Sequence, residues 1–393
     1  MSTPESQDAF AAVGLTCSAC GRAIPVGPAP VCPCGGVLDV NYDWERLSGW
    51  QPEGAGASRY EALLPFAPDV ERITLGEGKT PVLETDGVLL KCEHLNPTGS
   101  YKDRIGWVAI NVGVACGSPG WVGSSSGNAG SAFSAYGARA GLRGTLFTAA
   151  DVAPQKLAQM AIFGTEILFV DDFMTDPQAA QAAFGGIRTL AVRRQLVLGV
   201  TARTYNPVAM EGAKTIAYEL NEQLGEPPQA VYVPTGGGGL LSSIWAGFRD
   251  WRRLGLAAEA PRMIAVQPSG CAPIHKSFLR GDDRVTPVGT CVSQISGLQL
   301  PAPPDGDLVL AALRESNGFS VAVSDERAHE AQRELAKRYG VFVEPAAALA
   351  YAGYQARPEA RAVVILTGSG LKSSTWLDDA TIPTIRAEAI ERL

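Results

Sequence analysis

The segment NPTGSYKDR, residues 96–104, places Lys102 where it could act chemically. An apolar run at 88–91 that predicts a strand precedes it, and a pattern from Ile105 that predicts a helix follows. A lysine at such a junction lies near the positive end of the helix dipole and is partly desolvated, and both effects lower its pKa from about 10.4. The resulting neutral amine can form an imine with an aldehyde. Taken alone, however, the pattern fits an exposed lysine at a helix start equally well.

Two loops rich in glycine predict sites for anions. Residues 123–130, GSSSGNAG, and residues 234–240, PTGGGGL, each lie between a predicted strand and a predicted helix. Free N–H groups at a helix start attract a carboxylate or a phosphate, and glycines let the backbone approach it. The second loop predicts a phosphate site, although no Lys-Ser/Thr pair follows it as in a Walker motif. A capping turn and a flexible loop are the simpler alternatives.

A further hydroxyl, Thr367, follows the predicted strand at 362–366. Because ligands of open α/β sheets bind beyond the carboxyl ends of the strands, this hydroxyl can face a ligand there. A simple turn that ends the strand explains the same pattern.

Strand and helix signals alternate after residue 58, which predicts an α/β fold with a largely parallel sheet. The expected strands are 88–91, 121–123, 145–147, 167–170, 230–233, 263–266 and 362–366. Apolar residues at helical spacing predict a helix over 240–254. Another helix is expected over 324–340, because Ser324 is a typical N-cap and Gly340 a typical stop. Residues 1–45 form a separate cysteine-containing head, joined by a linker at about 48–58.

Composition excludes several classes of function. The 393 residues are 46% hydrophobic, enough for more than one domain, and the net charge of −7 without a basic block argues against a nucleic-acid partner. No apolar run approaches bilayer length, and the polar first ten residues do not resemble a secretory signal, so a cytoplasmic protein is expected. In that compartment we expect four scattered cysteines to be reduced and without a role: Cys92, Cys116, Cys271 and Cys291.

These motifs in this order resemble the threonine synthase family of fold-type-II enzymes that depend on pyridoxal phosphate (PLP). The segment 96–104 is similar to that family's Schiff-base segment, and GEGKTP at 76–81 to the signature before it. The resemblance covers about residues 17–372. It implies two open twisted sheets with flanking helices within a catalytic region at 46–393. It also implies a smaller, mobile subdomain at about 105–200 and a homodimer.

The resemblance also implies roles for single residues. Lys102 would hold PLP as a Schiff base and move the substrate proton, with Tyr101 beside it. Asn128 would bind the ring hydroxyl, and Thr367 would face the pyridine nitrogen. The cofactor phosphate would lie against Thr235, Gly236, Gly237, Gly238 and Gly239. The carboxylate of an amino-acid substrate would bind Ser125, Ser126, Gly127 and Ala129.

The head resembles the ribbon-like N-terminal element of one threonine synthase branch. Its four cysteines are Cys17, Cys20, Cys32 and Cys34. Four thiolates suit a structural zinc ion, but the second pair has the spacing Cys-x-Cys in place of Cys-x-x-Cys. Bound zinc and an empty remnant of the same fold therefore both stay open.

The sequence departs from the family where the substrate phosphate would bind. Val208 and Ala209 stand where Tyr and Arg are expected, and Gly237 and Leu240 replace two asparagines of the loop. Compensation could come from Arg203, Thr204 or Lys79. The leading hypothesis is a lyase acting at the β or γ carbon of O-phosphohomoserine or a related activated amino acid. A β-replacement enzyme using serine or phosphoserine, as in cysteate synthase, a serine/threonine dehydratase and a non-catalytic PLP-binding homologue are the alternatives.

Overall fold

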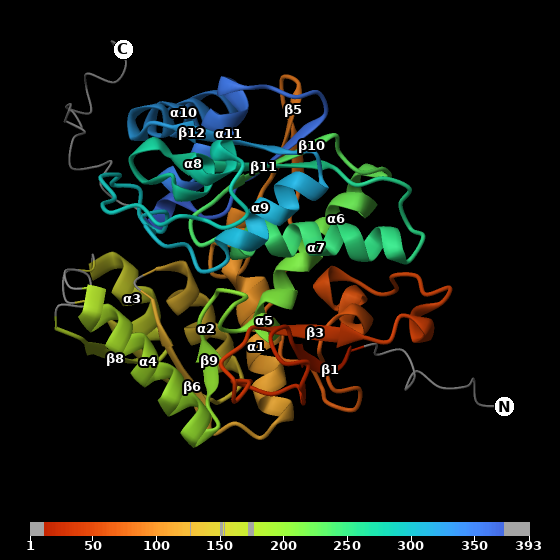
Figure 1. Cartoon of the computed structure of the whole chain (residues 1–393), viewed down its shortest axis with the longest axis vertical. Coiled ribbons are helices and arrows are strands. Elements are labelled where there is room, and N and C mark those ends of the chain that lie inside the picture. Colours follow the sequence, from red (N-terminus) through yellow and green to blue (C-terminus); the bar gives the residue numbers. More distant parts are fainter. Residues whose placement is uncertain (1–11, 126, 150–151, 153, 172–176, 373–393) are drawn as a thin grey trace, which may run out of the picture.

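The computed structural model describes residues 12–125, 127–149, 152, 154–171 and 177–372. Two separate sheets with helices around them form most of this part (Figure 1). The predicted fold class, with two open sheets and flanking helices, is confirmed. None of the described helices is both long and apolar enough to cross a membrane.

The larger sheet has six strands, and each neighbouring pair is parallel except the pair at one edge, β5 and β4. Its order is β12 (Phe319–Val323), β11 (Arg262–Pro268), β10 (Ala230–Pro234), β13 (Ala362–Ile365), β5 (Val88–Lys91) and β4 (Val82–Glu84). The central strands are buried on both faces, which is why they read as continuous apolar runs in the sequence. The loop before Lys102 starts from β5, next to β13.

The smaller sheet has four parallel strands in the order β8 (Glu166–Phe169), β7 (Arg143–Thr148), β6 (Gly120–Ser124) and β9 (Val197–Gly199). The eleven α-helices of the described residues are α1 (Lys102–Ala115), α2 (Asn128–Arg139), α3 (Pro154–Ile162), α4 (Pro177–Arg194), α5 (Pro207–Met210), α6 (Thr215–Leu224), α7 (Gly239–Arg253), α8 (Pro273–Arg280), α9 (Gly306–Glu315), α10 (Asp325–Tyr339) and α11 (Pro345–Ala356). The two predicted helices correspond to α7 and α10. Ser324 caps α10 by accepting from the Arg327 N–H, and Gly340 ends it in the left-handed conformation.

The N-terminal head is a small antiparallel sheet of β1 (Ala12–Cys17), β2 (Ala23–Ile24) and β3 (Leu38–Tyr42). It packs beside α5, as the dark red ribbon in Figure 1 shows. Two of its contacts meet at one buried carboxylate. The Tyr42 hydroxyl donates to Glu211, and the Arg203 guanidinium pairs with both Glu211 (2.9 Å) and Asp39 (3.8 Å). The head is thus bonded to the catalytic region through ionic groups.

Three strands of the larger and smaller sheets and one disulfide were not predicted from the sequence. Strands β4, β9 and β12 were not expected, and the first two are only three residues long, too short for a pattern to register. The expectation that Cys271 and Cys291 are reduced is wrong, because they form a disulfide with their Cα atoms 4.7 Å apart. Their segments lie side by side, joined by the bond from the Val292 N–H to the Gly270 carbonyl, and spacing along the chain does not reveal that proximity.

A fully buried ionic network lies beneath α1. Arg104 donates to Glu93 and Glu219 through several bonds of 2.8 Å, and Lys91 donates to Glu219 at 2.7 Å. Burial alone would raise the pKa of Glu219, but the charges of Arg104 and Lys91 outweigh it and lower that pKa to about 2. The network connects β5, α1 and α6, so it fixes the helix that begins with Lys102.

We expect Arg104→Leu to lower the free energy of unfolding by about 3–5 kcal/mol, because two carboxylates would stay buried without their main counter-charge. Urea unfolding followed by circular dichroism measures this loss. Arg338→Leu is the matched control, since Arg338 pairs with Asp86 at a side chain that is 55% exposed and should cost less than about 1 kcal/mol. Equal losses in the two variants would contradict the role given to the network.

Candidate active site

One cavity of about 530 Å³ collects the predicted motifs from both sheets. It opens beyond the carboxyl ends of β6, β10 and β13, the place that open parallel sheets offer to ligands. The predicted residues in its lining are Tyr101, Lys102, Ser125, Gly127, Asn128, Ala129, Thr235, Gly236, Gly237, Gly238, Gly239 and Thr367. Ser126 lies outside the described residues.

Lys102 is the first residue of α1, and its amine lies inside the cavity. Its Nζ donates to Thr201 Oγ1 at 2.5 Å. Burial lowers the pKa of Lys102 to about 7, and the negative charge of Asp305 opposes that shift. Near neutral pH a large share of this amine is therefore uncharged, which is the form that attacks an aldehyde.

The glycine loop passes closely over neighbouring backbone before α7 begins. A Cβ at Gly236 would lie 2.6 Å from the Gly297 carbonyl oxygen, and one at Gly239 would lie 2.8 Å from Asp305 Oδ2. Gly238, the N-cap of α7, has a φ of 94°, and no side chain caps this helix. Gly236 and Gly238 have no room for a side chain against this backbone, and the start of a fifteen-residue helix faces the cavity, an arrangement that suits a phosphate group.

The second loop leads into α2, whose start also lacks a side-chain cap. Asn128 opens this helix and lies between two charged side chains. Its Nδ2 donates to Glu344 Oε1 at 2.8 Å, while Lys372 Nζ donates to its Oδ1 at 2.9 Å. These bonds fix which way the Asn128 amide points, with its donor towards Glu344.

Of the predicted substrate residues in the described chain, Lys79 and Thr204 lie outside the cavity lining. Lys79 is exposed, and its backbone N–H donates to Glu219. The Thr204 hydroxyl is engaged by Asp305 Oδ1 at 2.7 Å. Arg203 does not reach the cavity either, because its guanidinium points to Glu211 and Asp39. None of these three side chains is part of the cavity lining.

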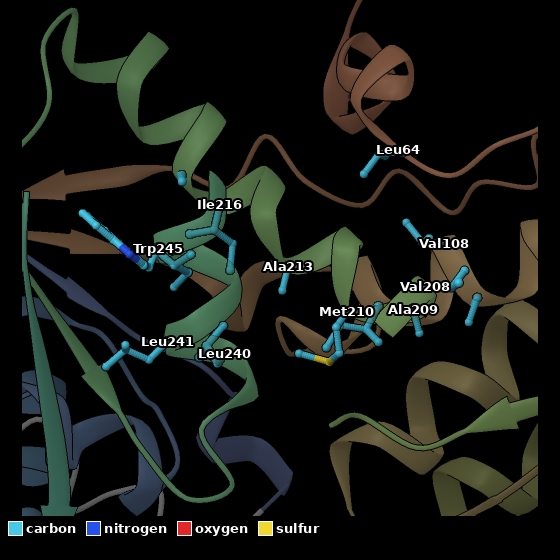
Figure 2. Packing of buried hydrophobic residues seen from close by; sticks show 14 of the residues in the cluster. Leu64, Val108, Val208, Ala209, Met210, Ala213, Ile216, Leu240, Leu241 and Trp245 are labelled. Carbon is cyan, nitrogen blue, oxygen red and sulfur yellow. The ribbon is translucent and has the colours of Figure 1, made fainter. Parts of the chain in front are cut away.

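The two departures in the segment after Asn206 are buried in an apolar cluster. Figure 2 shows Val208, Ala209 and Met210 on α5 in the same cluster as Leu240 and Leu241 of α7. Ala209 has no exposed surface and does not line the cavity. The cluster joins α5 to α7 behind the glycine loop, so apolar packing supports the loop from that side.

The family model "Pyridoxal-phosphate dependent enzyme" matches residues 73–368, three quarters of the chain. The chain belongs to this PLP-dependent enzyme family. It is similar to the threonine synthase of Methanocaldococcus jannaschii, with 32% identity over 91% of this chain and 92% of that protein. The threonine synthase of Synechocystis is also 32% identical, with coverage of 91% and 90%. The predicted family, and with it PLP as the cofactor, is confirmed.

Solved structures of PLP-dependent enzymes share the fold. Maize serine racemase has a TM-score of 0.62 at 21% identity, covering 74% of this chain and 88% of that one. An L-serine ammonia-lyase from Rhizomucor miehei has a TM-score of 0.59 at 24% identity, covering 74% and 93%. At these identities the likeness establishes the architecture and leaves the substrate open.

Three residues of this PLP-dependent enzyme's site went unrecognised in the sequence. Thr201 contacts Lys102, Lys372 contacts Asn128, and Asp305 lies behind the glycine loop, where it accepts from the Arg203 N–H at 2.7 Å. Thr201 follows the three-residue strand β9, and Asp305 follows a proline-rich loop, so neither belongs to a recognisable pattern. Lys372 lies five residues after Thr367, and this closeness in sequence could have predicted its place in the site.

The four head cysteines also come together. Their Sγ atoms all lie within 4.8 Å of one another, and Gly36 leaves room for them, since a Cβ there would lie 2.5 Å from Cys17 Sγ. Four sulfurs at such distances match the ligand set of a tetrahedral structural zinc site. The arrangement fits the metal despite the Cys-x-Cys spacing of the second pair.

We expect the rate at which added PLP forms its visible imine band with the apo-protein to rise with pH, with a midpoint near 7, and then to level off. The reason is that the neutral form of Lys102 predominates above its pKa of about 7, whereas an ordinary lysine would continue to gain reactivity to about pH 10. Stopped-flow absorbance between pH 5.5 and 9.5 measures the profile.

Asp305→Asn should move this midpoint to lower pH, because the negative charge of Asp305 favours the ammonium form of Lys102. Asp307→Asn is the control, since Asp307 is exposed two residues further along the chain. A rate that keeps rising above pH 9, or a midpoint that rises in Asp305→Asn, would contradict the explanation by burial.

Proposed function

We propose that this protein eliminates or replaces a group at the β or γ carbon of an amino acid. O-Phosphohomoserine or a related activated amino acid is the substrate class that its threonine synthase relatives suggest. The observation that carries the proposal is the buried amine of Lys102, with its pKa of about 7, in one cavity with the glycine loop at the start of α7. An imine-forming lysine and a phosphate cradle are the two requirements of PLP binding.

PLP supplies the electron sink that lets a proton leave the substrate's α carbon. The chain's own residues bind and orient the reactants. The start of α7 would hold the cofactor phosphate, Asn128 would hold the ring hydroxyl, and the start of α2 would hold the substrate carboxylate, since all three lie in the cavity lining. Lys102 Nζ would accept the α proton and later return it, because an amine with a pKa of about 7 populates both forms near neutral pH.

Thr367 is the proposed neighbour of the pyridine nitrogen. Its side chain is largely buried in the cavity lining, and its carbonyl accepts from the Tyr101 N–H at 3.1 Å, which ties it to the segment carrying Lys102. A neutral hydroxyl does not force that nitrogen to take up a proton, unlike a carboxylate. A less electron-poor ring favours elimination and replacement over transamination.

We further propose that the head binds one structural zinc ion through Cys17, Cys20, Cys32 and Cys34. Four cysteine ligands leave no open position for substrate, so the metal would stabilise the head and take no part in the reaction. Because Tyr42 and Asp39 of the head contact the region behind the glycine loop, the metal would also support the cavity indirectly.

The purified protein with PLP should show a visible imine band that Lys102→Ala abolishes. The other lysine among the described lining residues is Lys372, and its amine donates to Asn128 Oδ1 at 2.9 Å. Lys337→Ala is the matched control, since Lys337 is exposed on α10 and should leave the band unchanged. Absorption spectra before and after PLP addition test this. A band that survives in Lys102→Ala, or a protein that stays colourless with PLP, would refute the assignment.

Metal analysis by inductively coupled plasma mass spectrometry should find about one zinc per chain. Cys20→Ser should lower that content and the melting temperature, because three thiolates hold zinc less tightly. Cys116→Ser is the control, since Cys116 is an exposed free cysteine outside the cluster. Equal zinc in both variants would show that the head does not hold the metal.

A further inference from the structure

A phosphorylated amino acid would bring a third anionic group into the cavity, after the cofactor phosphate and the substrate carboxylate. Four helix starts without a side-chain cap lie at the cavity, those of α7, α2, α1 and α11. In the proposed function, the start of α7 binds the cofactor phosphate and the start of α2 binds the substrate carboxylate. A phosphate on the substrate would therefore need another helix start or a positive side chain in the cavity.

The starts of α1 and α11 suit a phosphate less well. At α1, the Lys102 N–H donates to Ser100 Oγ at 3.3 Å and the Asp103 N–H to the Ser100 carbonyl at 3.2 Å. At α11, the first residue is Pro345, which has no N–H, and the carboxylate of the N-cap residue Glu344 lies in the lining. A carboxylate at that helix start repels a second anion.

Cations are also few. Among the described residues that line the cavity, the positive side chains are Lys102 and Lys372, and there is no arginine. Lys102 is the cofactor's ligand, and Lys372 is bonded to Asn128, which itself contacts Glu344. Arg203 turns away to Glu211 and Asp39. The buried carboxyl of Asp305 behind the glycine loop adds no positive charge.

The remaining polar lining is neutral. Thr201, Tyr205, Gln294 and Ser296 offer hydroxyl and amide groups, beside the apolar Phe184 and Leu300. Such groups can hydrogen-bond an alcohol, but a phosphate dianion buried among them would lose its hydration without a counter-charge. Phosphate sites favour arginine because its fork matches the oxygen atoms.

We propose that the group leaving the substrate is a hydroxyl, so that the enzyme acts on a β-hydroxy amino acid of the serine or threonine type in preference to a phosphate ester. The proposal rests on the proposed function, since it assigns α7 and α2 to the cofactor phosphate and the carboxylate. Lys102 takes the α proton, the Cβ–O bond breaks, and the hydroxide that leaves takes a proton and departs as water. One water then enters, and the products are a 2-oxo acid and ammonium, so no oxidant or reductant is required.

The test uses the PLP-loaded enzyme and three matched pairs: serine and O-phosphoserine, threonine and O-phosphothreonine, homoserine and O-phosphohomoserine. Steady-state kcat/KM is measured from 2-oxo acid, released phosphate and threonine. Isothermal titration calorimetry of the same amino acids with the PLP-loaded Lys102→Ala variant measures their dissociation constants without turnover. D-Serine is the stereochemical control.

We expect serine or threonine to exceed its phosphorylated partner by at least roughly tenfold in kcat/KM, and the phosphate esters to bind Lys102→Ala no more tightly than the alcohols. Preference for any phosphate ester, in turnover or in binding, would overturn the hydroxyl proposal and leave the proposed function standing. Turnover of none of the six would also overturn it. Absence of the cofactor band, by contrast, would refute the proposed function itself.

Discussion

The guanidinium of Arg104 is the interaction on which the site's geometry depends. Two carboxylates, Glu93 and Glu219, are buried beneath α1 and could not remain ionised there without it. Because Arg104 is two residues from Lys102, the bonds that satisfy these charges also set the position of the first turn of α1. Lys102 is thus placed by a network whose residues do not line the cavity.

The cavity above that network is electrostatically different. Beneath α1, opposite charges are paired at 2.7–2.8 Å. Among the described residues that line the cavity, by contrast, the charged side chains are Lys102, Lys372 and Glu344, and burial lowers the pKa of Lys102 to about 7. The same burial has opposite consequences in the two places. The buried ions beneath α1 stay charged because each has an opposite charge beside it. Burial lowers the pKa of the Lys102 amine, which has only the carboxylate of Asp305 to oppose that shift. The first turn of α1, from Lys102 to Arg104, thus lies between the ionic network and the cavity.

Much of the architecture, and the loops that line the cavity, could be predicted from the sequence, because each depends on local order along the chain. The apolar runs of β5, β10 and β13, the caps of α10 and the three loop motifs are all short contiguous signals. Thr201 and Asp305 could not be found in this way, since they approach Lys102 only through the packing of distant segments. The disulfide between Cys271 and Cys291 and the outward direction of Arg203 have the same cause.

Arg203 has a consequence for how this molecule can change over evolutionary time. Its backbone N–H bonds Asp305 behind the glycine loop, while its side chain bonds Glu211 and reaches Asp39 in the head. Tyr42 of the head donates to the same Glu211. A lineage that discarded the head would expose this buried carboxylate on one side and loosen the residue that braces Asp305. Loss of the head in a lineage is therefore expected to bring compensating substitutions at Arg203 and Glu211.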